Sequence, residues 1–428
     1  MIINPQKIID LALTYDVSEA EIYQLSSLSH PVVFEANRLK QLQSKQFQGT
    51  ALRLWKQGRP GLAVAYGSID PQELVEKAIA LSQLNPPKTM ELSKPRIAIY
   101  PNIGSSISVE TLISKGKTAI NQLRDTYPDA ICNGEFSCEE YTTLLMNSQG
   151  LHCQYKETSI NYYLGLEWIR GENFLGIYDG ESTRNKLDPD KVIKWILQRL
   201  QWANKNVSPP TGKIPILFTP DAVTMLWETV ADAINGKRVL ENSSPWNGKL
   251  GEVVMSPKIT LFQDLQRDPY SCPFDDEGTP TQLLSLITQG QLKQFYSDHT
   301  VARELGQNST GNGFRPGLEH YPTPSLGNMI IESGTQSFEE LISKLDNALI
   351  VDQMLGGGAD ISGEFSINVD LGYRIDKGEI TGRVKDTMVA GNIYTALKQV
   401  IGLGNDSRWN GSCHTPSLVV EGLSVIGE

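Results

Sequence analysis

Hydrophobic and polar positions change their period several times along the first half of the chain. Apolar residues cluster closely after a proline and predict a short helix over residues 5–15. Apolar and polar residues alternate over residues 20–67, as they do in strands, and KQGRPG within this segment is typical of a hairpin turn. Three later segments predict helices: one is capped by Asp70 and opened by Pro71, one is capped by Ser108 and has one apolar face, and one starts at Asp188. The first half therefore predicts helices packed on an antiparallel sheet.

The pattern changes again near the middle of the chain. NKNVSPPTGK, at residues 204–213, places prolines, a serine and a glycine between a complete helix and the new strand IPILF. After one further helix, the second half is mostly strands and glycine-rich turns. A chain of 428 residues exceeds what one hydrophobic core usually organises. We expect an α+β fold with two domains: 1–205, with helices on antiparallel sheet, and 206–428, mainly β with few helices.

Composition and charge narrow the classes of function. Hydrophobic residues make up 39% of the chain and charged residues 20%, as in globular proteins. The 38 Lys and Arg face 49 Asp and Glu, a net charge of −11 without a basic patch, which argues against nucleic-acid binding. The five cysteines lack the spacing of zinc ribbons or redox motifs, and no long apolar run is present. We expect a cytoplasmic protein that binds neither nucleic acid nor membrane.

The helix that follows the first strand of the second half combines a core stripe with two acids. Residues 225–237 read MLWETVADAINGK, and the pattern predicts a helix over 220–235 with Thr219 as its N-cap. Trp227 belongs to the apolar stripe, whereas Glu228 and Asp232 lie together on its flank. These acids are either a solvated edge or carriers of a metal or a proton in catalysis. The residues alone favour the solvated edge.

A second set of candidates lies in turns. Asp275, Asp276 and Glu277 end at Gly278, and in a turn they could face one ion, although a hydrogen-bonded turn is commoner. Two glycine-rich loops have neither the P-loop nor the dinucleotide-binding spacing, and they fit tight turns or the close approach of a peptide backbone. The candidates in these loops are Gly311, Asn312, Gly313, Gly356, Gly357 and Gly358.

Cys413 and His414 are the minimum pair for a thiol nucleophile. Adjacent residues on a strand point to opposite faces, so the imidazole is badly placed to activate the thiol. A lone cysteine is more often a small buried residue than a nucleophile. A structural role for Cys413 is therefore favoured, and a catalytic role stays open.

Several motifs succeed one another in a fixed order along the chain. They are FEANRLKQLQSKQFQGTALRLW at residues 34–55, PFDDEGTPT at 273–281, STGNG at 309–313, GGGADISGEFS at 356–366, AGNI at 390–393 and GNDSRWNGSCHTPSLVVEGLSV at 404–425. This ordered set, which spans nearly the whole chain, resembles the TldD/PmbA family, also called the modulator of DNA gyrase family.

The resemblance implies a family with two kinds of subunit. TldD-type subunits carry HExxxH on the helix after the first strand of the C-terminal domain, where the histidines and a later cysteine bind a metal. In this sequence Trp227, Glu228 and Asp232 stand in the places of the first histidine, the glutamate and the second histidine. Indole has no lone pair to offer a cation. The resemblance thus implies a PmbA/TldE-type subunit with a degenerate site and no metal or other cofactor of its own.

The resemblance also implies a function. The chain is expected to join a TldD-type HExxxH subunit, which holds zinc, in a heterodimeric metallopeptidase that acts on peptides or unfolded polypeptide segments. Cys413 and the turn candidates are then expected to belong to the substrate groove or an interface, and a homodimer in isolation stays open. Two other hypotheses are a stand-alone hydrolase that uses Cys413 or Asp275–Glu277, and a non-catalytic protein-binding modulator of gyrase or toxin–antitoxin complexes.

Overall fold

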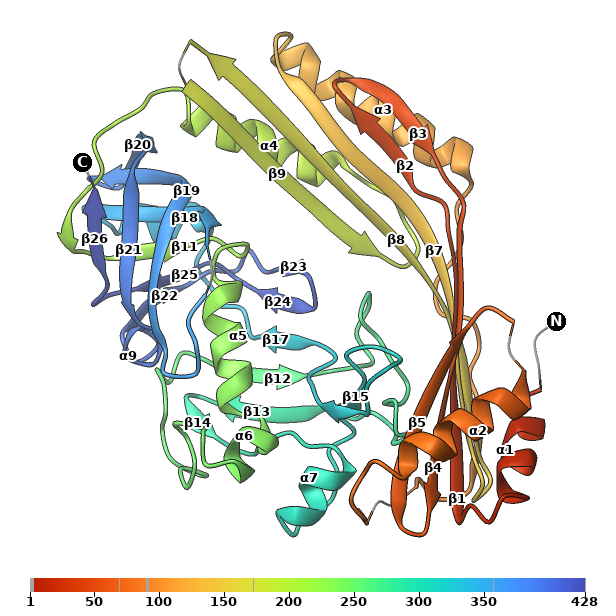
Figure 1. Ribbon diagram of the computed structural model, residues 1–428. Helices are drawn as coiled ribbons and strands as arrows, with labels where there is room; N and C mark the ends of the chain where they lie inside the picture. Colours follow the sequence, from red (N-terminus) through yellow and green to blue (C-terminus); the bar gives the residue numbers. More distant parts are fainter. Residues whose placement is uncertain (1–3, 69, 90–91, 172, 357, 428) are drawn as a thin grey trace.

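A computed structural model describes residues 4–427, except residues 69, 90–91, 172 and 357. About 20% of the chain is helix and 41% is strand, and the strands form sheets in both halves (Figure 1). The predicted α+β fold class is thereby confirmed. Within the described residues, no helix has both the length and the apolar composition needed to cross a membrane.

The first half is built on one large sheet with several long strands. Its strands within the described residues are β1 (Glu19–Ser29), β2 (Val32–Glu35), β3 (Arg38–Leu42), β4 (Lys45–Lys56), β5 (Arg59–Tyr66), β6 (Arg96–Ile99), β7 (Ile131–Asn147), β8 (Leu151–Arg170) and β9 (Asn173–Thr183). The order is β3-β2-β7-β1-β4-β5, and β8 pairs with β6, β7 and β9. The pairs are antiparallel except for β6 with β8. Gln57 and Gly58, with φ of 52° and 72°, form the predicted hairpin turn.

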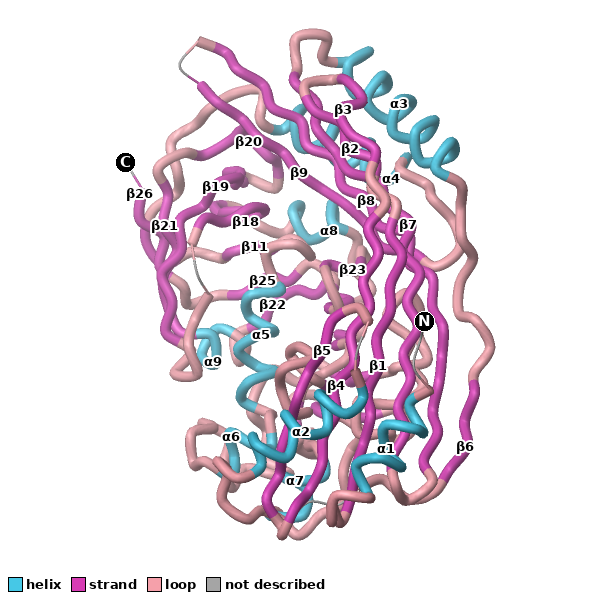
Figure 2. Tube along the Cα trace, turned by 45° about the vertical axis from the view of Figure 1, so that its right-hand side comes forward, coloured by secondary structure: helices cyan, strands magenta, loops and turns pink. Residues whose placement is uncertain are grey.

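Four helices accompany this sheet in the described residues: α1 (Pro5–Leu13), α2 (Pro71–Ser82), α3 (Val109–Thr126) and α4 (Asp190–Trp202). Two of them begin at the caps that the sequence predicts. The Asp70 carboxylate accepts the N–H of Gln72 at 2.9 Å, and the Ser108 hydroxyl accepts the N–H of Thr111 at 3.2 Å. Figure 2 shows α1 and α2 near one end of the sheet and α3 near the other.

The second half contains two larger sheets and a short ribbon. Its strands in the described residues are β10 (Gly212–Lys213), β11 (Ile216–Phe218), β12 (Leu261–Gln263), β13 (Leu284–Thr288), β14 (Gln291–Leu292), β15 (Gly313–Phe314), β16 (Thr323–Pro324), β17 (Met329–Ile331), β18 (Asn347–Leu355), β19 (Glu364–Asp376), β20 (Glu379–Val384), β21 (Thr387–Asn392), β22 (Val400–Leu403), β23 (Arg408–Asn410), β24 (Cys413–Thr415), β25 (Leu418–Val420) and β26 (Ser424–Gly427). One sheet has the order β10-β26-β21-β19-β18-β11-β25-β22, with β20 beside β19, and the other has the order β14-β13-β12-β17-β24-β23. The ribbon pairs β15 with β16.

The helices of the second half are short, as expected for a mainly β segment. In the described residues they are α5 (Thr224–Ala233), α6 (Gly236–Leu240), α7 (His299–Glu304), α8 (Phe338–Ser343) and α9 (Ile393–Ala396). In the centre of Figure 1, α5 runs beside strands of both larger sheets, and its apolar side chains share a core with them.

The hydrophobic cores do not divide cleanly at the middle of the chain. One core lies wholly in the second half and contains the inner face of α5. Another joins Phe136 and Ile193 of the first half to Phe338 and Tyr373 of the second half. Each sheet belongs to one half, yet burial of apolar surface holds the halves together. The predicted domain boundary between residues 205 and 206 stays a prediction.

Candidate functional site

The helix that carries the candidate metal positions is shorter than the pattern predicts. It begins at Thr224 instead of 220, and its N-cap residue, Val223, makes no side-chain capping bond, so the predicted cap at Thr219 is wrong. The reason lies in the preceding turn. There the carbonyl of Asp221 accepts the Thr224 hydroxyl at 2.8 Å and the side-chain amide of Asn410 at 3.0 Å. Because the Asp221 carbonyl accepts these two side chains, it is not used as a backbone acceptor in the first turn of a longer helix.

Trp227 lies in the core, as the apolar stripe predicts. Its side chain is fully buried, and its Nε1–H donates to the hydroxyl of Thr415 on β24 at 2.8 Å. The neighbouring stripe residues Leu226 and Val230 are fully buried as well. The position that the family resemblance aligns with a metal-binding histidine therefore holds a hydrogen-bond donor that points at another protein group.

Three predicted residues, Glu228, Asp232 and Cys413, line one cleft of 510 Å³. Glu228 is exposed, and Asp232 is half-buried with its carboxylate 3.5 Å from the guanidinium of Arg238. Positions 227 and 232 are five residues apart, which places them about 140° apart around a helix. One side chain thus enters the core while the other reaches the cleft, and the two do not converge.

Cys413 and His414 diverge as alternation on a strand requires. Cys413 reaches the cleft, whereas His414 contacts the ring of Trp409, with ring centroids 4.9 Å apart. Burial, with the charge of Glu228, raises the pKa of the Cys413 thiol to about 12, and burial lowers the pKa of His414 to about 4. A protonated thiol is a poor nucleophile. The stand-alone hydrolase based on Cys413 stays a hypothesis that these features disfavour.

The residues around α5 do not fit a resident zinc ion. A catalytic zinc site needs three protein ligands and one open position. Trp227 offers no lone pair, and Asp232 is engaged by Arg238. Over the part of the chain that the structure describes, no group of three or more His, Cys, Asp or Glu side chains is arranged to hold a metal ion.

The acidic run at Asp275 lies in a network of backbone hydrogen bonds. Asp275 is fully buried, and its carboxylate accepts the N–H groups of Glu277 at 3.1 Å, Thr279 at 2.8 Å and Gly313 at 2.9 Å. Burial raises its pKa, with the charge of Glu277 adding to the effect. The structure thus joins the motifs at 273–281 and 309–313, which are distant in sequence, in one hydrogen-bonded turn.

The other two acids of the run also accept backbone N–H groups. Asp276 accepts the N–H of Arg315 at 2.7 Å, and Glu277 accepts the N–H of His299 at 2.8 Å. Burial raises the pKa of both carboxyl groups. The sequence allowed two interpretations of this run, an ion-binding turn or a hydrogen-bonded turn. The observed geometry is that of a hydrogen-bonded turn. Its predicted place in a substrate groove or in an interface with another chain is untested.

Gly278 has a position in this turn that other residues cannot take. Its φ is +82°, and a Cβ there would lie 2.6 Å from the Cδ2 atom of Leu151 in the first half. Its carbonyl accepts the guanidinium of Arg96 at 2.9 Å. The turn therefore also forms part of the contact between the two halves of the chain.

The glycine loops lie in two different places. Asn312 is fully buried between Gly311 and Gly313, and its side-chain amide donates to Gln263 at 2.8 Å and to the carbonyl of Ser325 at 2.9 Å. The loop after β18 is separate and more exposed: Gly356 has a φ of +101°, and a Cβ on Gly358 would lie 3.1 Å from Met225 of α5. The predicted residue Gly357 lies outside the described residues.

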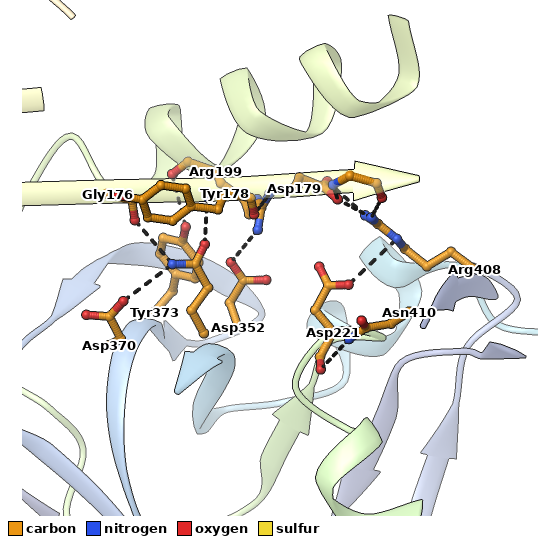
Figure 3. A network of polar contacts seen from close by, with 12 residues as sticks. Gly176, Tyr178, Asp179, Arg199, Asp221, Asp352, Asp370, Tyr373, Arg408 and Asn410 are labelled. Carbon is orange, nitrogen blue, oxygen red and sulfur yellow. Dashed lines mark hydrogen bonds and ion pairs between the residues drawn. The ribbon is translucent and has the colours of Figure 1, made fainter. Parts of the chain in front are cut away.

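Figure 3 shows a charged network that the sequence did not reveal. Arg199 of α4 is fully buried, with ion pairs of 3.3 Å to Asp179 and 3.2 Å to Asp352. Arg408 of β23 donates to Asp179 at 2.9 Å, and its Nε lies 3.8 Å from the carboxylate of Asp221. The network connects β9 and α4 of the first half with the turn that precedes α5.

Asp221 of this network has a perturbed pKa. Burial raises its pKa to about 6, Arg408 partly offsets that shift, and Asp179 adds to it. Some members of the network carry a signal in the sequence: Arg408 belongs to the motif at 404–425, and Asp221 lies in the first turn of the helix predicted over 220–235. Arg199 and Asp352 are 153 residues apart, so no local pattern reports their contact.

Two family models match the chain. The one described as PmbA/TldA metallopeptidase C-terminal domain matches residues 211–427, and the one described as PmbA/TldA metallopeptidase domain 1 matches residues 20–82. The first alone includes α5, the cleft beside it and the acidic run. The second lies in the segment that contains β1 to β5.

Named relatives extend this likeness. The metalloprotease TldD homolog of Haemophilus influenzae is 30% identical over 240 residues, which are 55% of this chain and 48% of that protein. The chain thus matches about half of that relative's length. A metalloprotease of Methanothermobacter thermautotrophicus is 24% identical over 417 residues, which are 92% of this chain and 89% of that protein.

Solved structures share the fold over nearly the whole chain. TldE from Thermococcus kodakarensis has a TM-score of 0.91 and 26% identity, with 99% of each chain covered. A Thermotoga maritima protein described as a candidate modulator of a DNA gyrase has a TM-score of 0.86 and 25% identity, with 98% of this chain and 99% of that chain covered. The arrangement of both halves is therefore shared with these proteins.

Proposed function

Because this chain belongs to the PmbA/TldA metallopeptidase family, we propose that it is the PmbA/TldE-type subunit of a heterodimeric metallopeptidase. The chain holds no metal of its own, and a TldD-type subunit with HExxxH supplies the zinc. The pair acts on peptides or on unfolded polypeptide segments. In this assembly the chain contributes architecture and part of the substrate cleft.

One observation carries the proposal. Trp227 fills the place of the first metal-binding histidine with a buried indole, and its N–H is used by Thr415. A metal at this place would require a lone pair that indole lacks, and a second ligand on the opposite side of the helix. The likeness to TldE from Thermococcus kodakarensis, over 99% of both chains, supports the same subunit type.

The cleft beside α5 supports a role near the substrate. Glu228 is exposed at its edge, although a general base of a metallopeptidase acts on a metal-bound water that this helix cannot hold. The cleft is thus suited to holding a chain segment without cutting it. Hydrolysis is left to the metal site of the partner subunit.

Metal analysis of the purified chain tests the proposal directly. The chain is produced alone, exchanged into metal-free buffer with added zinc, desalted and measured by mass spectrometry for bound metal. A TldD-type chain with HExxxH, treated in parallel, is the positive control. We expect far less than one zinc per chain here and near one in the control. Stoichiometric, tightly held zinc in this chain would overturn the proposal.

Association with the partner is tested with the TldD-type chain encoded in the same source organism. The two chains are co-expressed with one tag, and the complex is assayed on an unfolded peptide with and without a chelator. We expect co-purification and chelator-sensitive cleavage by the pair only. Chelator-sensitive cleavage by this chain alone, or failure to associate under all conditions, contradicts the heterodimer.

A further inference from the structure

A second cleft, of 520 Å³, lies between the two halves of the chain. The first half lines it with residues of β7, β8 and β9, and the second half lines it with the turn before α5 and the segment around β23. Asn410 and Gly411 line both this cleft and the one beside α5. The two clefts therefore adjoin at the end of β23.

The charges in this cleft do not balance. Its lining includes the carboxylates of Glu135, Asp179, Glu181 and Asp221 and one cationic side chain, Arg408. Arg408 is already bonded to Asp179. Within the residues that the structure describes, Glu135 forms no ion pair, whereas Glu181 accepts the hydroxyl of the buried Tyr162 and points to the other face of the sheet. The free charge in the cleft is thus negative.

Aromatic rings border the same space. Tyr163 and Tyr178 are 46% and 44% exposed, and the ring of Tyr178 lies against Gly165 of β8, where a Cβ would come within 2.5 Å of it. The absence of a side chain at Gly165 lets the tyrosine ring lie against the sheet. Across the cleft, the rings of Tyr270 and Trp409 are 4.9 Å apart. Faces of such rings attract cations.

We propose that this cleft binds the ammonium or guanidinium group of a basic side chain in a peptide. The carboxylate of Glu135 neutralises the cation, and Tyr163, which lies directly opposite Glu135 on β8, and Tyr178 provide aromatic faces for it and for its aliphatic stem. The adjoining cleft beside α5 then takes the neighbouring residues of the same peptide. The inference rests on the proposed function for the peptide as ligand, and it specifies a preference for lysine or arginine.

Binding to the isolated chain tests the proposal. Two fluorescent unfolded peptides of equal length, with lysines in one and glutamines in the other, are titrated by fluorescence anisotropy at low and high salt. We expect the lysine peptide to bind at least about fivefold more tightly at low salt, and this advantage to shrink at high salt. Spermidine is added as a competitor, and displacement of the lysine peptide measures whether a free amine also binds at this site.

Variants assign the effect to this cleft. Glu135→Gln and, separately, Tyr163→Leu are each expected to remove most of the advantage of the lysine peptide. Glu140→Gln changes the charge of an exposed residue on the same strand, β7, and is expected to leave binding unchanged. Thermal unfolding of each variant confirms that it is folded.

Two outcomes overturn the proposal. One is equal affinity for the two peptides, which makes a free amine the ligand if spermidine binds. The other is an equal loss in Glu140→Gln and Glu135→Gln. The experiment uses this chain without its partner and without metal. Its failure is therefore distinguishable from failure of the heterodimer, which is measured by co-purification and by cleavage.

Discussion

The hydrogen bond of Trp227 leads to a prediction about stability that tests its structural role. Trp227→Phe removes the N–H that Thr415 accepts and leaves the buried hydroxyl with one partner fewer. Trp55→Phe is a matched control, because Trp55 is 3% exposed and its Nε1 has no hydrogen-bond partner in the described structure. Phenylalanine at residue 55 keeps an aromatic face for Arg53, whose guanidinium lies 5.1 Å from the Trp55 ring.

The expected changes in the free energy of unfolding depend on the apolar area that each ring buries and on the hydrogen bond to Thr415. A fully buried tryptophan removes up to about 250 Å² from water, worth roughly 6 kcal/mol as an upper bound. Replacement by phenylalanine keeps most of that area in both variants. Loss of the bond to Thr415 should therefore make Trp227→Phe more destabilising than Trp55→Phe by about 1 to 2 kcal/mol.

The assay is urea unfolding followed by circular dichroism, with the variant Thr415→Val completing a double-mutant cycle. We expect a coupling energy between Trp227→Phe and Thr415→Val of about 1 kcal/mol, because the second change removes the hydroxyl that the first leaves unpaired. Equal losses in Trp227→Phe and Trp55→Phe, together with zero coupling, would refute the claim that the indole is held by this bond.

Three further predictions concern the charged network and the cleft. Arg199→Met leaves Asp352 buried without this cation, and it should lower the free energy of unfolding by about 3 to 5 kcal/mol in the same urea assay. The double variant Arg199→Met/Asp352→Leu also removes the buried carboxylate, and it should recover most of that loss. The folded-state pKa of Asp221, about 6, lies above that of an unfolded aspartate, so its contribution to stability falls as pH rises from about 4 to about 6. Asp221→Asn should flatten that slope; an unchanged slope contradicts the shift. Cys413 should react with iodoacetamide more than about a hundredfold more slowly in the folded than in the unfolded protein, as measured by mass spectrometry, and fast labelling contradicts its raised pKa.

The first half of the fold was predictable because its signals are local. The alternation of apolar and polar residues over 20–67 and the caps at Asp70 and Ser108 act within a few residues of the element that they specify. The apolar stripe of α5 likewise placed Trp227 in the core. The exact start of α5 was not predictable, since a distant side chain, that of Asn410, takes part in the turn before it.

The amino-acid sequence by itself determined the α+β class, the family and the fact that residue 227 cannot bind a metal, because these depend on residue types and their order. Only the tertiary structure decided which distant residues meet. It joined Asp275 to Gly313, brought Glu228 and Cys413 to one cleft, and built the network around Arg199 from three separate segments. Such contacts depend on how sheets and helices pack, and packing selects partners by shape and burial across the whole chain, which no local period encodes.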